Sequence, residues 1–306
     1  MTSNTWVIGS GGLLGSAVAK TLSDSFPATP IRWSHHDESI KDLKENLHDF
    51  SQQLNSDQPW RIIWAAGHAT VSSNPAQCDQ EREVFENFTL EAEQILVSPG
   101  TYFLASSAGG VYAGSVDPPF TKNTIAIPAS AYGNLKLSQE NLLTQIFFLR
   151  SNVTTVIGRI SNLYGPGQNL NKLQGLISHL ILAALTKKTM NIFVPLDTIR
   201  DFVFVNDAAQ VISRLTTMDS PPEIAVIASG EPQSLATVIS QVQAVIRIKI
   251  PISYGDHASS SGQAADLRMI TTIPCPQLTP FPAGVKTMQL DLAQRLQEND
   301  GFLSGS

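Results

Sequence analysis

The chain has 306 residues, 42% hydrophobic and 15% charged, with a net charge of −6. A chain of this size can bury a large core, as one large domain or two smaller ones. The negative charge excludes the basic surplus that binding to nucleic acid phosphates requires. No apolar run reaches the roughly 20 residues that cross a bilayer, and no signal peptide follows Met1. We therefore expect a cytoplasmic protein with neither a membrane nor a nucleic acid partner.

Short β-rich runs alternate with helical stretches along the chain. The clearest strand candidates are residues 5–8, 61–65, 101–105, 153–160 and 224–228. Each is almost entirely apolar, as expected for strands that helices cover on both faces. The pattern predicts an α/β fold with a Rossmann-type, doubly wound parallel sheet in residues 1–163, to which residues 201–229 return. Residues 164–200 and 230–306 are predicted to form a smaller, substrate-binding region, which is mostly C-terminal.

A glycine-rich turn follows the first apolar run and precedes a helical stretch. Its sequence is Gly9-Ser10-Gly11-Gly12-Leu13-Leu14-Gly15. Glycines let the backbone approach a pyrophosphate closely, and the helix N-terminus offers free N–H groups and a positive dipole end. We therefore expect these glycines, with Leu13 and Leu14, to hold a dinucleotide. The spacing departs from the common G-x-G-x-x-G pattern, and the alternative is a turn that needs glycine for packing alone.

The residues that would choose between NAD and NADP lie further along. The acidic residue expected about 20 positions after the turn, to bind the ribose of NAD, is missing. A second strand is predicted to end at residues 31–36, where Arg32 and Ser34 could meet the 2′-phosphate of NADP instead. This favours NADP over NAD. The alternative is a solvated strand end whose acidic residue, Asp37 or Glu38, lies slightly later.

Tyr132 and Lys136 stand four residues apart in a predicted helix. This spacing places them on one helix face, with the ammonium near the phenol. A free tyrosine has a pKa of about 10, so a nearby positive charge is needed to make its phenolate available at neutral pH. The pair could then transfer a proton to or from a substrate oxygen while a nicotinamide exchanges a hydride. By itself the pattern also occurs by chance, as a half-buried Tyr beside a solvated Lys.

The order of motifs resembles the extended short-chain dehydrogenase/reductases, the NAD(P)-dependent epimerase/dehydratase group. The motifs run from the glycine turn through Ala65-Ala66-Gly67, Asn87, Ser106-Ser107, Val111-Tyr112 and Tyr132-x-x-x-Lys136 to residues 159–167 and Arg200-Asp201-Phe202. The resemblance covers nearly the whole chain. Residues 159–167 and 200–208 carry it most strongly, as the group's loop after a strand and its R-D-F-x-x-V-x-D segment.

This resemblance implies a role for each matched residue. Tyr132 and Lys136 would be catalytic, Arg200 would meet a substrate diphosphate, and Asn162 would contact the substrate. Residues that would contact the cofactor, besides the turn and the catalytic pair, are Ala65, Ala66, Gly67, Asn87 and Ser106. A guanidinium suits phosphate because it donates two parallel hydrogen bonds. The alternative for Arg200 is a surface salt bridge to Asp197 or Asp201.

The chain departs from the group's pattern at its third catalytic residue. The usual Ser or Thr falls on Ala108, and Ser107 is the nearest hydroxyl that could replace it; its alternative role is strand-end capping. The Asp-Glu pair of the group's dehydratases is also missing. The resemblance therefore implies an epimerase or keto-reductase of a nucleotide-sugar. A reductase of a non-nucleotide carbonyl and a non-catalytic NAD(P)-sensing protein stay open as alternatives.

Three further expectations concern spacing and assembly. Residues 35–61 are too few for the group's usual additional strand and helix. The two cysteines and the histidines lack metal-ligand spacing, so we expect no metal site. The helices predicted after Asn87 and around Tyr132 occupy positions through which members of the group form dimers, which implies a homodimer.

Overall fold

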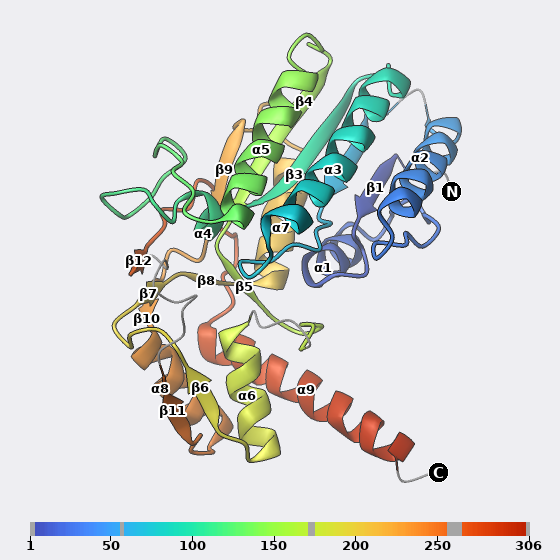
Figure 1. Cartoon of the computed structure of the whole chain (residues 1–306). Helices are drawn as coiled ribbons and strands as arrows, with labels where there is room; N and C mark the ends of the chain where they lie inside the picture. The colour runs from blue at the N-terminus through green and yellow to red at the C-terminus, as the bar shows by residue number, and fades with distance from the viewer. Residues whose placement is uncertain (1–3, 56–57, 171–174, 256–264, 304–306) are drawn as a thin grey trace.

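The computed structural model describes residues 4–55, 58–170, 175–255 and 265–303. A larger lobe is built on a central sheet, and a smaller, mainly helical lobe lies below it in Figure 1. The sheet has the strand order β1-β2-β3-β4-β9, and all of its neighbours are parallel. Its strands are β1 (Thr5–Ile8), β2 (Trp60–Trp64), β3 (Gly100–Ser107), β4 (Val153–Ile160) and β9 (Ile224–Ile227). These are the five strands predicted from the sequence, and the α/β fold is confirmed.

Helices cover both faces of the sheet, so its strands are apolar on both sides. Helices α1 (Leu13–Leu22) and α7 (Val205–Leu215) contact each other and lie on one face. Helices α2 (His36–Gln52), α3 (Pro75–Ile95) and α5 (Ala131–Ile146) lie on the other face. Within β1, Trp6 and Ile8 join the core under α2 and α3, whereas Val7 joins the core under α1. This alternation is the period of two expected of a strand.

The sheet, as far as the structure describes it, ends at β1, and the second strand predicted near residues 31–36 is wrong. Residues 24–32 run past β1 without strand structure, and α2 begins at His36. Phe26 N donates one hydrogen bond to Thr5 O at 2.7 Å. Pro27 and Pro30 then remove two backbone donors from this stretch, which prevents a continuous ladder.

The smaller lobe packs three helices around its own apolar core. These are α6 (Leu176–Thr186), α8 (Leu235–Ile246) and α9 (Phe281–Leu303). Ser234 caps α8 by accepting a hydrogen bond from Thr237 N at 3.2 Å, as expected for an N-terminal serine. Strand β6 (Met190–Ile192) pairs with β11 (Ile252–Tyr254) at the far side of this lobe.

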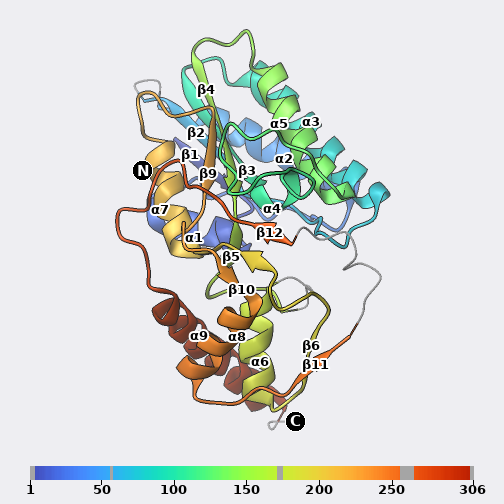
Figure 2. The same cartoon turned by 90° about the vertical axis from the view of Figure 1, so that its left-hand side faces the viewer.

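Short strands lie where the two lobes meet (Figure 2). Strand β5 (Asn162–Tyr164) pairs with β8 (Phe202–Phe204), and β7 (Ile199–Arg200) lies between β10 (Gln233–Ser234) and β12 (Asp266–Leu267). The chain thus crosses the junction several times. Within the described ranges, no helix is both long enough and apolar enough to pass through a bilayer.

Candidate active site

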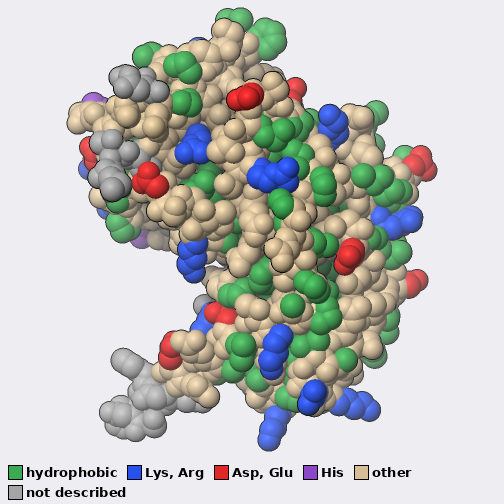
Figure 3. All heavy atoms as spheres, turned by 180° about the vertical axis from the view of Figure 1, so that it is seen from behind, with side chains coloured by type: hydrophobic (Ala, Val, Ile, Leu, Met, Phe, Trp, Pro, Cys, Tyr) green, Lys and Arg blue, Asp and Glu red, His purple; other side chains and the backbone are tan. Residues whose placement is uncertain are grey.

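The C-terminal ends of the parallel strands face the smaller lobe (Figure 1), and the predicted site residues follow these ends. Seen from behind, the molecular surface is indented on one side between the two lobes (Figure 3). In open parallel sheets, ligands bind beyond the carboxyl ends of the strands. The local geometry at the ends of β1, β2 and β3 therefore decides what the site can hold.

The glycine turn after β1 is closely fitted to the end of β2. Gly9 has a φ of +89°, and a Cβ on it would lie 2.7 Å from Ala66 N. A Cβ on Gly15 would overlap the Gly9 carbonyl, whereas a Cβ on Gly11 would meet nothing within 4 Å. Gly12 precedes α1 without any side-chain cap, which leaves the first N–H groups of α1 available to an anion. This open, uncapped cradle fits the pyrophosphate of a dinucleotide.

Tyr132 and Lys136 lie on the first turns of α5. Ser130 starts this helix by accepting a hydrogen bond from Gly133 N at 3.1 Å. Lys136 Nζ lies 5.7 Å from the centroid of the Tyr132 ring. The lysine side chain is 6% exposed, whereas Tyr132 is half-buried. The i, i+4 spacing therefore brings a buried ammonium beside a phenol, as predicted.

Two residues that the sequence did not single out hold this ammonium. Lys136 Nζ donates to Gln139 Oε1 at 2.9 Å and to Glu81 Oε1, on α3, at 3.2 Å. Burial alone would lower the pKa of Lys136, but the charge of Glu81 raises it above its ordinary value. Burial likewise opposes ionisation of Glu81, yet Lys136 and two backbone N–H groups lower its pKa. Gln139 follows Lys136 by three residues, a helical spacing that could have indicated it; no sequence signal links Glu81 to a lysine 55 positions later.

Ser107 lies close to Tyr132 at the end of β3. Its Oγ accepts a hydrogen bond from Gly110 N at 3.1 Å and so caps α4 (Ala108–Val111). A Cβ on Gly110 would lie 3.4 Å from Ser107 Oγ and 3.3 Å from Tyr132 Cε1. The glycine thus lets a hydroxyl and a phenol ring converge on one space. Ala108, where the resemblance places the usual hydroxyl, is fully buried.

Ser106 and Asn87 use their side chains within the fold. Ser106 precedes Ser107 in β3, and its hydroxyl donates to Glu140 Oε1, on α5, at 2.5 Å. Glu140 also accepts hydrogen bonds from Arg159. Asn87 Nδ2 donates to Glu83 O, one turn earlier in α3, at 2.9 Å. These contacts are structural, and the cofactor contacts predicted for both residues remain predictions.

Arg32 is surrounded by carboxylates. Its Nε donates to Asp42 Oδ2 at 2.9 Å, its Nη2 donates to Asp42 Oδ1, and Glu38 lies 3.2 Å from Nη1. The Arg32 guanidinium holds the pKa of Asp42 at about 2, well below its ordinary value. Ser34 Oγ lies 2.9 Å from His35 Nδ1. The positive charge that was predicted to meet a 2′-phosphate is therefore already compensated by Asp42, on α2.

Arg200 and Asn162 lie near the junction of the lobes. Arg200 donates from Nη1 to the carbonyl of Ile199 at 2.8 Å, and burial lowers the pKa of Arg200 to about 10. No ion pair within the described residues joins it to Asp197 or Asp201. The Asp201 carboxylate instead accepts hydrogen bonds from Ser161, Ser229 and Gly230. Asn162 Nδ2 donates to Asp201 O at 2.9 Å.

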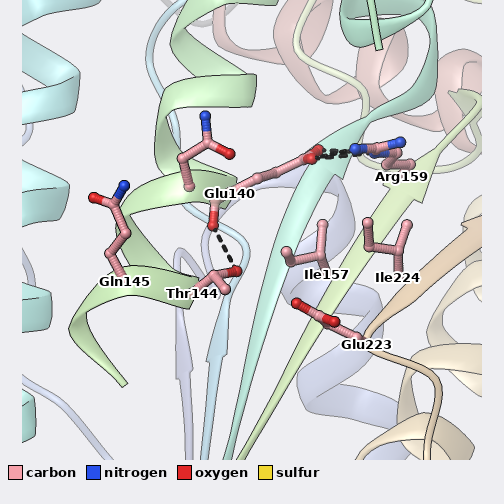
Figure 4. A pocket seen from close by; sticks show the side chains of 8 residues that line it. Glu140, Thr144, Gln145, Ile157, Arg159, Glu223 and Ile224 are labelled. Carbon is pink, nitrogen blue, oxygen red and sulfur yellow. Dashed lines mark hydrogen bonds and ion pairs between the residues drawn. The ribbon is translucent and has the colours of Figure 1, made fainter. Parts of the chain in front are cut away.

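A hollow of about 300 Å³ lies between α5 and the strands β4 and β9. Figure 4 shows Glu140 reaching across it to Arg159, with Ile157, Glu223 and Ile224 nearby. Its lining contains none of the predicted site residues. The described residues also contain no group of three or more His, Cys, Asp or Glu side chains placed to hold a metal ion.

A family model and curated relatives match the sequence of this chain. The sequence model of the NAD dependent epimerase/dehydratase family matches residues 5–228. A dTDP-4-dehydro-6-deoxyglucose reductase from Escherichia coli is 28% identical over 166 residues, which are 54% of this chain and 52% of that protein. A dTDP-L-rhamnose 4-epimerase from Burkholderia thailandensis is 35% identical over 97 residues, 31% of this chain and 26% of that protein. The matched part thus spans about half of the length of the reductase and about a quarter of the length of the epimerase.

A solved structure shows the same fold over a longer range. The UDP-glucose 4-epimerase of Thermotoga maritima, crystallised with UDP-glucose, superposes with a TM-score of 0.79 at 18% identity. The superposition covers 95% of this chain and 99% of that one. The family match spans the glycine turn, the Tyr132–Lys136 pair and the Arg200 segment alike. The chain belongs to the NAD dependent epimerase/dehydratase family.

Proposed function

We propose that this chain is an NAD(P)-dependent epimerase or keto-reductase of a nucleotide-sugar, with Tyr132 as the general acid and base. The observation that carries the proposal is the position of the buried Lys136 ammonium. It lies 5.7 Å from the centroid of the Tyr132 ring and beside Gly67, in the loop that meets the glycine turn. The names of the relatives support the substrate class, because one is a reductase and the other an epimerase of dTDP-linked sugars.

The reaction we propose is a proton transfer at Tyr132 matched to a hydride transfer. When bound, the nicotinamide supplies the hydride chemistry. Tyr132 Oη takes the proton from a substrate hydroxyl in the oxidative direction and returns it to a carbonyl oxygen in the reductive direction. Lys136 favours the phenolate by its charge. Ser107 Oγ, which accepts from Gly110 N, keeps its own proton to donate to the reacting oxygen.

Arg200 supports a substrate that carries a diphosphate. Its guanidinium is partly buried with a backbone carbonyl as acceptor, and the nearby Asp266 carboxylate already pairs with Arg268; a buried cation with so little counter-charge is costly. An anionic group of the substrate would supply that counter-charge. By contrast, Ala108, Gly109 and Gly110 provide no carboxylate to expel water from a sugar, so we propose epimerisation or reduction in place of dehydration.

Two secondary features of the proposal follow from α2, α3 and α5. Because Asp42 and Glu38 already compensate Arg32, a 2′-phosphate would meet carboxylates there, and we propose that the chain prefers NAD to the NADP suggested by the sequence.

We also propose a homodimer formed through the outer faces of α3 and α5, where Leu90 is 45% exposed. Light scattering gives the mass that checks the dimer.

The alternative of a non-catalytic NAD(P)-sensing protein rests on Ala108, and Tyr132→Phe separates it from the enzyme. We expect this variant to bind NAD as tightly as the wild type does. Calorimetric titrations with NAD and, separately, with NADP measure the two affinities. Its turnover of dTDP- or UDP-linked sugars should fall by about 10² to 10⁴, the worth of a general acid and base. Tyr254→Phe, at an exposed position, is the control. Unchanged turnover in Tyr132→Phe would rule out the mechanism, and no turnover in the wild type would favour the sensor.

A further inference from the structure

Glu81 makes three hydrogen bonds that join three parts of the larger lobe. Its Oε1 accepts from Lys136 Nζ, on α5, at 3.2 Å. Its Oε2 accepts from His68 N and Ala69 N, in the loop after β2, at 2.7 Å each. The carboxylate itself lies on α3 and is 10% exposed. A buried carboxylate with donors on both oxygens is fixed in position.

The ion pair of Glu81 and Lys136 lies directly under the loop that borders the glycine turn. A Cβ on Gly67 would come 3.0 Å from Glu81 Oε1 and 3.5 Å from Lys136 Nζ. Gly67 itself is exposed, and the preceding residue, Ala66, touches Gly9. The pair therefore lies beside an exposed glycine of the loop that meets the glycine turn, as well as between α3 and α5.

We propose that Glu81 is a positioning residue that holds the Lys136 ammonium charged and aimed at Tyr132. The proposal rests on the function proposed above, in which Lys136 supplies charge to Tyr132. Without a counter-charge, a fully buried ammonium gives up its proton readily, because burial penalises the charged form. Gln139 contributes a neutral acceptor at 2.9 Å and cannot replace a carboxylate in this respect.

The other titratable groups around Lys136 do not provide this charge. Glu81 and Cys78 face it from α3, and Tyr132 faces it from its own helix. Cys78 is buried, which raises the pKa of its thiol and keeps it neutral. Tyr132 is the group on which Lys136 is meant to act. The carboxylate of Glu81 is thus the anion among them that can keep Lys136 protonated before the phenol ionises.

The test measures the charge on Lys136 without any substrate. Acetic anhydride acylates only uncharged amines, so the extent of Lys136 labelling after a short pulse, read by mass spectrometry across pH, gives the midpoint of its ionisation. In E81Q we expect that midpoint to fall by about one pH unit or more. A glutamine at this position also cannot accept from Lys136 and from both backbone N–H groups at once. The alkaline limb of the turnover profile should move to lower pH by the same amount.

Two further variants make the result decisive. E81D keeps the charge but shortens the side chain, and should lower the midpoint by less than half as much; if E81Q is too unstable to label, the direction of the E81D shift decides. E86Q removes a carboxylate of the same helix that pairs with Arg82 and should leave the midpoint unchanged. An unchanged or raised midpoint in both Glu81 variants overturns the proposal. Because labelling needs no sugar, a lowered midpoint without turnover would retain the role of Glu81 and reject the proposed function alone.

Discussion

Arg200 is a partly buried cation, and the nearby carboxylate that favours its charge, Asp266, is itself paired with Arg268. It donates to a neighbouring carbonyl, and burial lowers its pKa to about 10. Asp201, its neighbour in sequence, is fully buried and is used by Ser161, Ser229 and Gly230. The surface salt bridge considered from the sequence therefore does not form with Asp201. This arrangement leaves the guanidinium with capacity for an anionic ligand.

Arg200→Ala should consequently separate the candidate substrates. We expect the KM for a nucleotide-sugar to rise by about 10- to 100-fold, since a hydrogen bond to a charged group contributes roughly 1.5–3 kcal/mol. The KM for a neutral ketone should hardly change. Steady-state kinetics with both substrates, and Arg214→Ala as the control, check this. Equal effects on the two substrates would contradict a diphosphate contact.

At the residue scale, local spacing predicted what lies on one element. Tyr132 and Lys136 were recognisable because four residues in a helix place two side chains on one face. Glu81 was not, because its approach to Lys136 depends on how α3 packs against α5. The pairing of Arg32 with Asp42 was missed for a related reason: residues 31–36 were expected to be a strand, so Asp42 was not expected to lie in a helix beside Arg32.

At the scale of elements, the start of α5 sets the position of Tyr132. Ser130 Oγ accepts from Gly133 N at 3.1 Å, and a Cβ on Gly133 would overlap the carbonyl of Gly110. The first turn of α5 is therefore pressed against α4, next to Ser107. If α5 began at a different residue, the Tyr132 phenol would move relative to Ser107.

Ser130→Ala removes this cap. We expect the free energy of unfolding to fall by about 1 kcal/mol, the usual cost of losing an N-cap hydroxyl, and kcat to fall more than NAD affinity. Urea unfolding and calorimetry give the two quantities. Ser138→Ala, in the interior of the same helix, is the matched control and should be nearly neutral. A stability loss with an unaltered kcat would show that Tyr132 keeps its place without the cap.

The five strands of the sheet were the most predictable elements. The absence of a strand near residues 31–36 was the least predictable feature. All five strands of the sheet appear as apolar runs because helices cover both their faces. The run near residues 31–36 resembles a strand end, yet Pro27 and Pro30 interrupt the hydrogen-bonding that β1 could offer. The strand is absent because this stretch lacks backbone N–H donors. A pattern of side-chain hydrophobicity does not show which backbone donors are present.

At the scale of the whole molecule, the larger lobe has an apolar core on each face of its sheet, and the smaller lobe has a separate core of its own. The smaller lobe's core joins α6, α8 and α9, with Tyr164 and Phe204 from the junction. We propose that residues 164–200 and 230–306 bind the substrate, while residues 1–163 and 201–229 bind the cofactor. A defect confined to the core of the smaller lobe should therefore weaken substrate binding more than cofactor binding.

Met288→Ala tests this division, since Met288 is 1% exposed in the core of the smaller lobe. Truncating a buried methionine costs about 2–5 kcal/mol. We expect a lower Tm and weaker substrate binding, with NAD affinity retained at 20 °C. Met218→Ala, at an exposed methionine, is the control. Loss of NAD affinity together with substrate affinity would argue that the lobes act as a single unit.

The missing neighbour of β1 has a consequence for how the protein behaves at high concentration. An open outer strand offers its amide and carbonyl groups to a strand from another molecule, which is a common start of aggregation. Here the coil of residues 24–32 lies along that side, tied by Phe26 N to Thr5 O and by the edge-on packing of Phe26 against Trp6 at 5.5 Å. Its two prolines cannot serve as donors in turn. The same stretch that keeps the sheet short also shields it from intermolecular pairing.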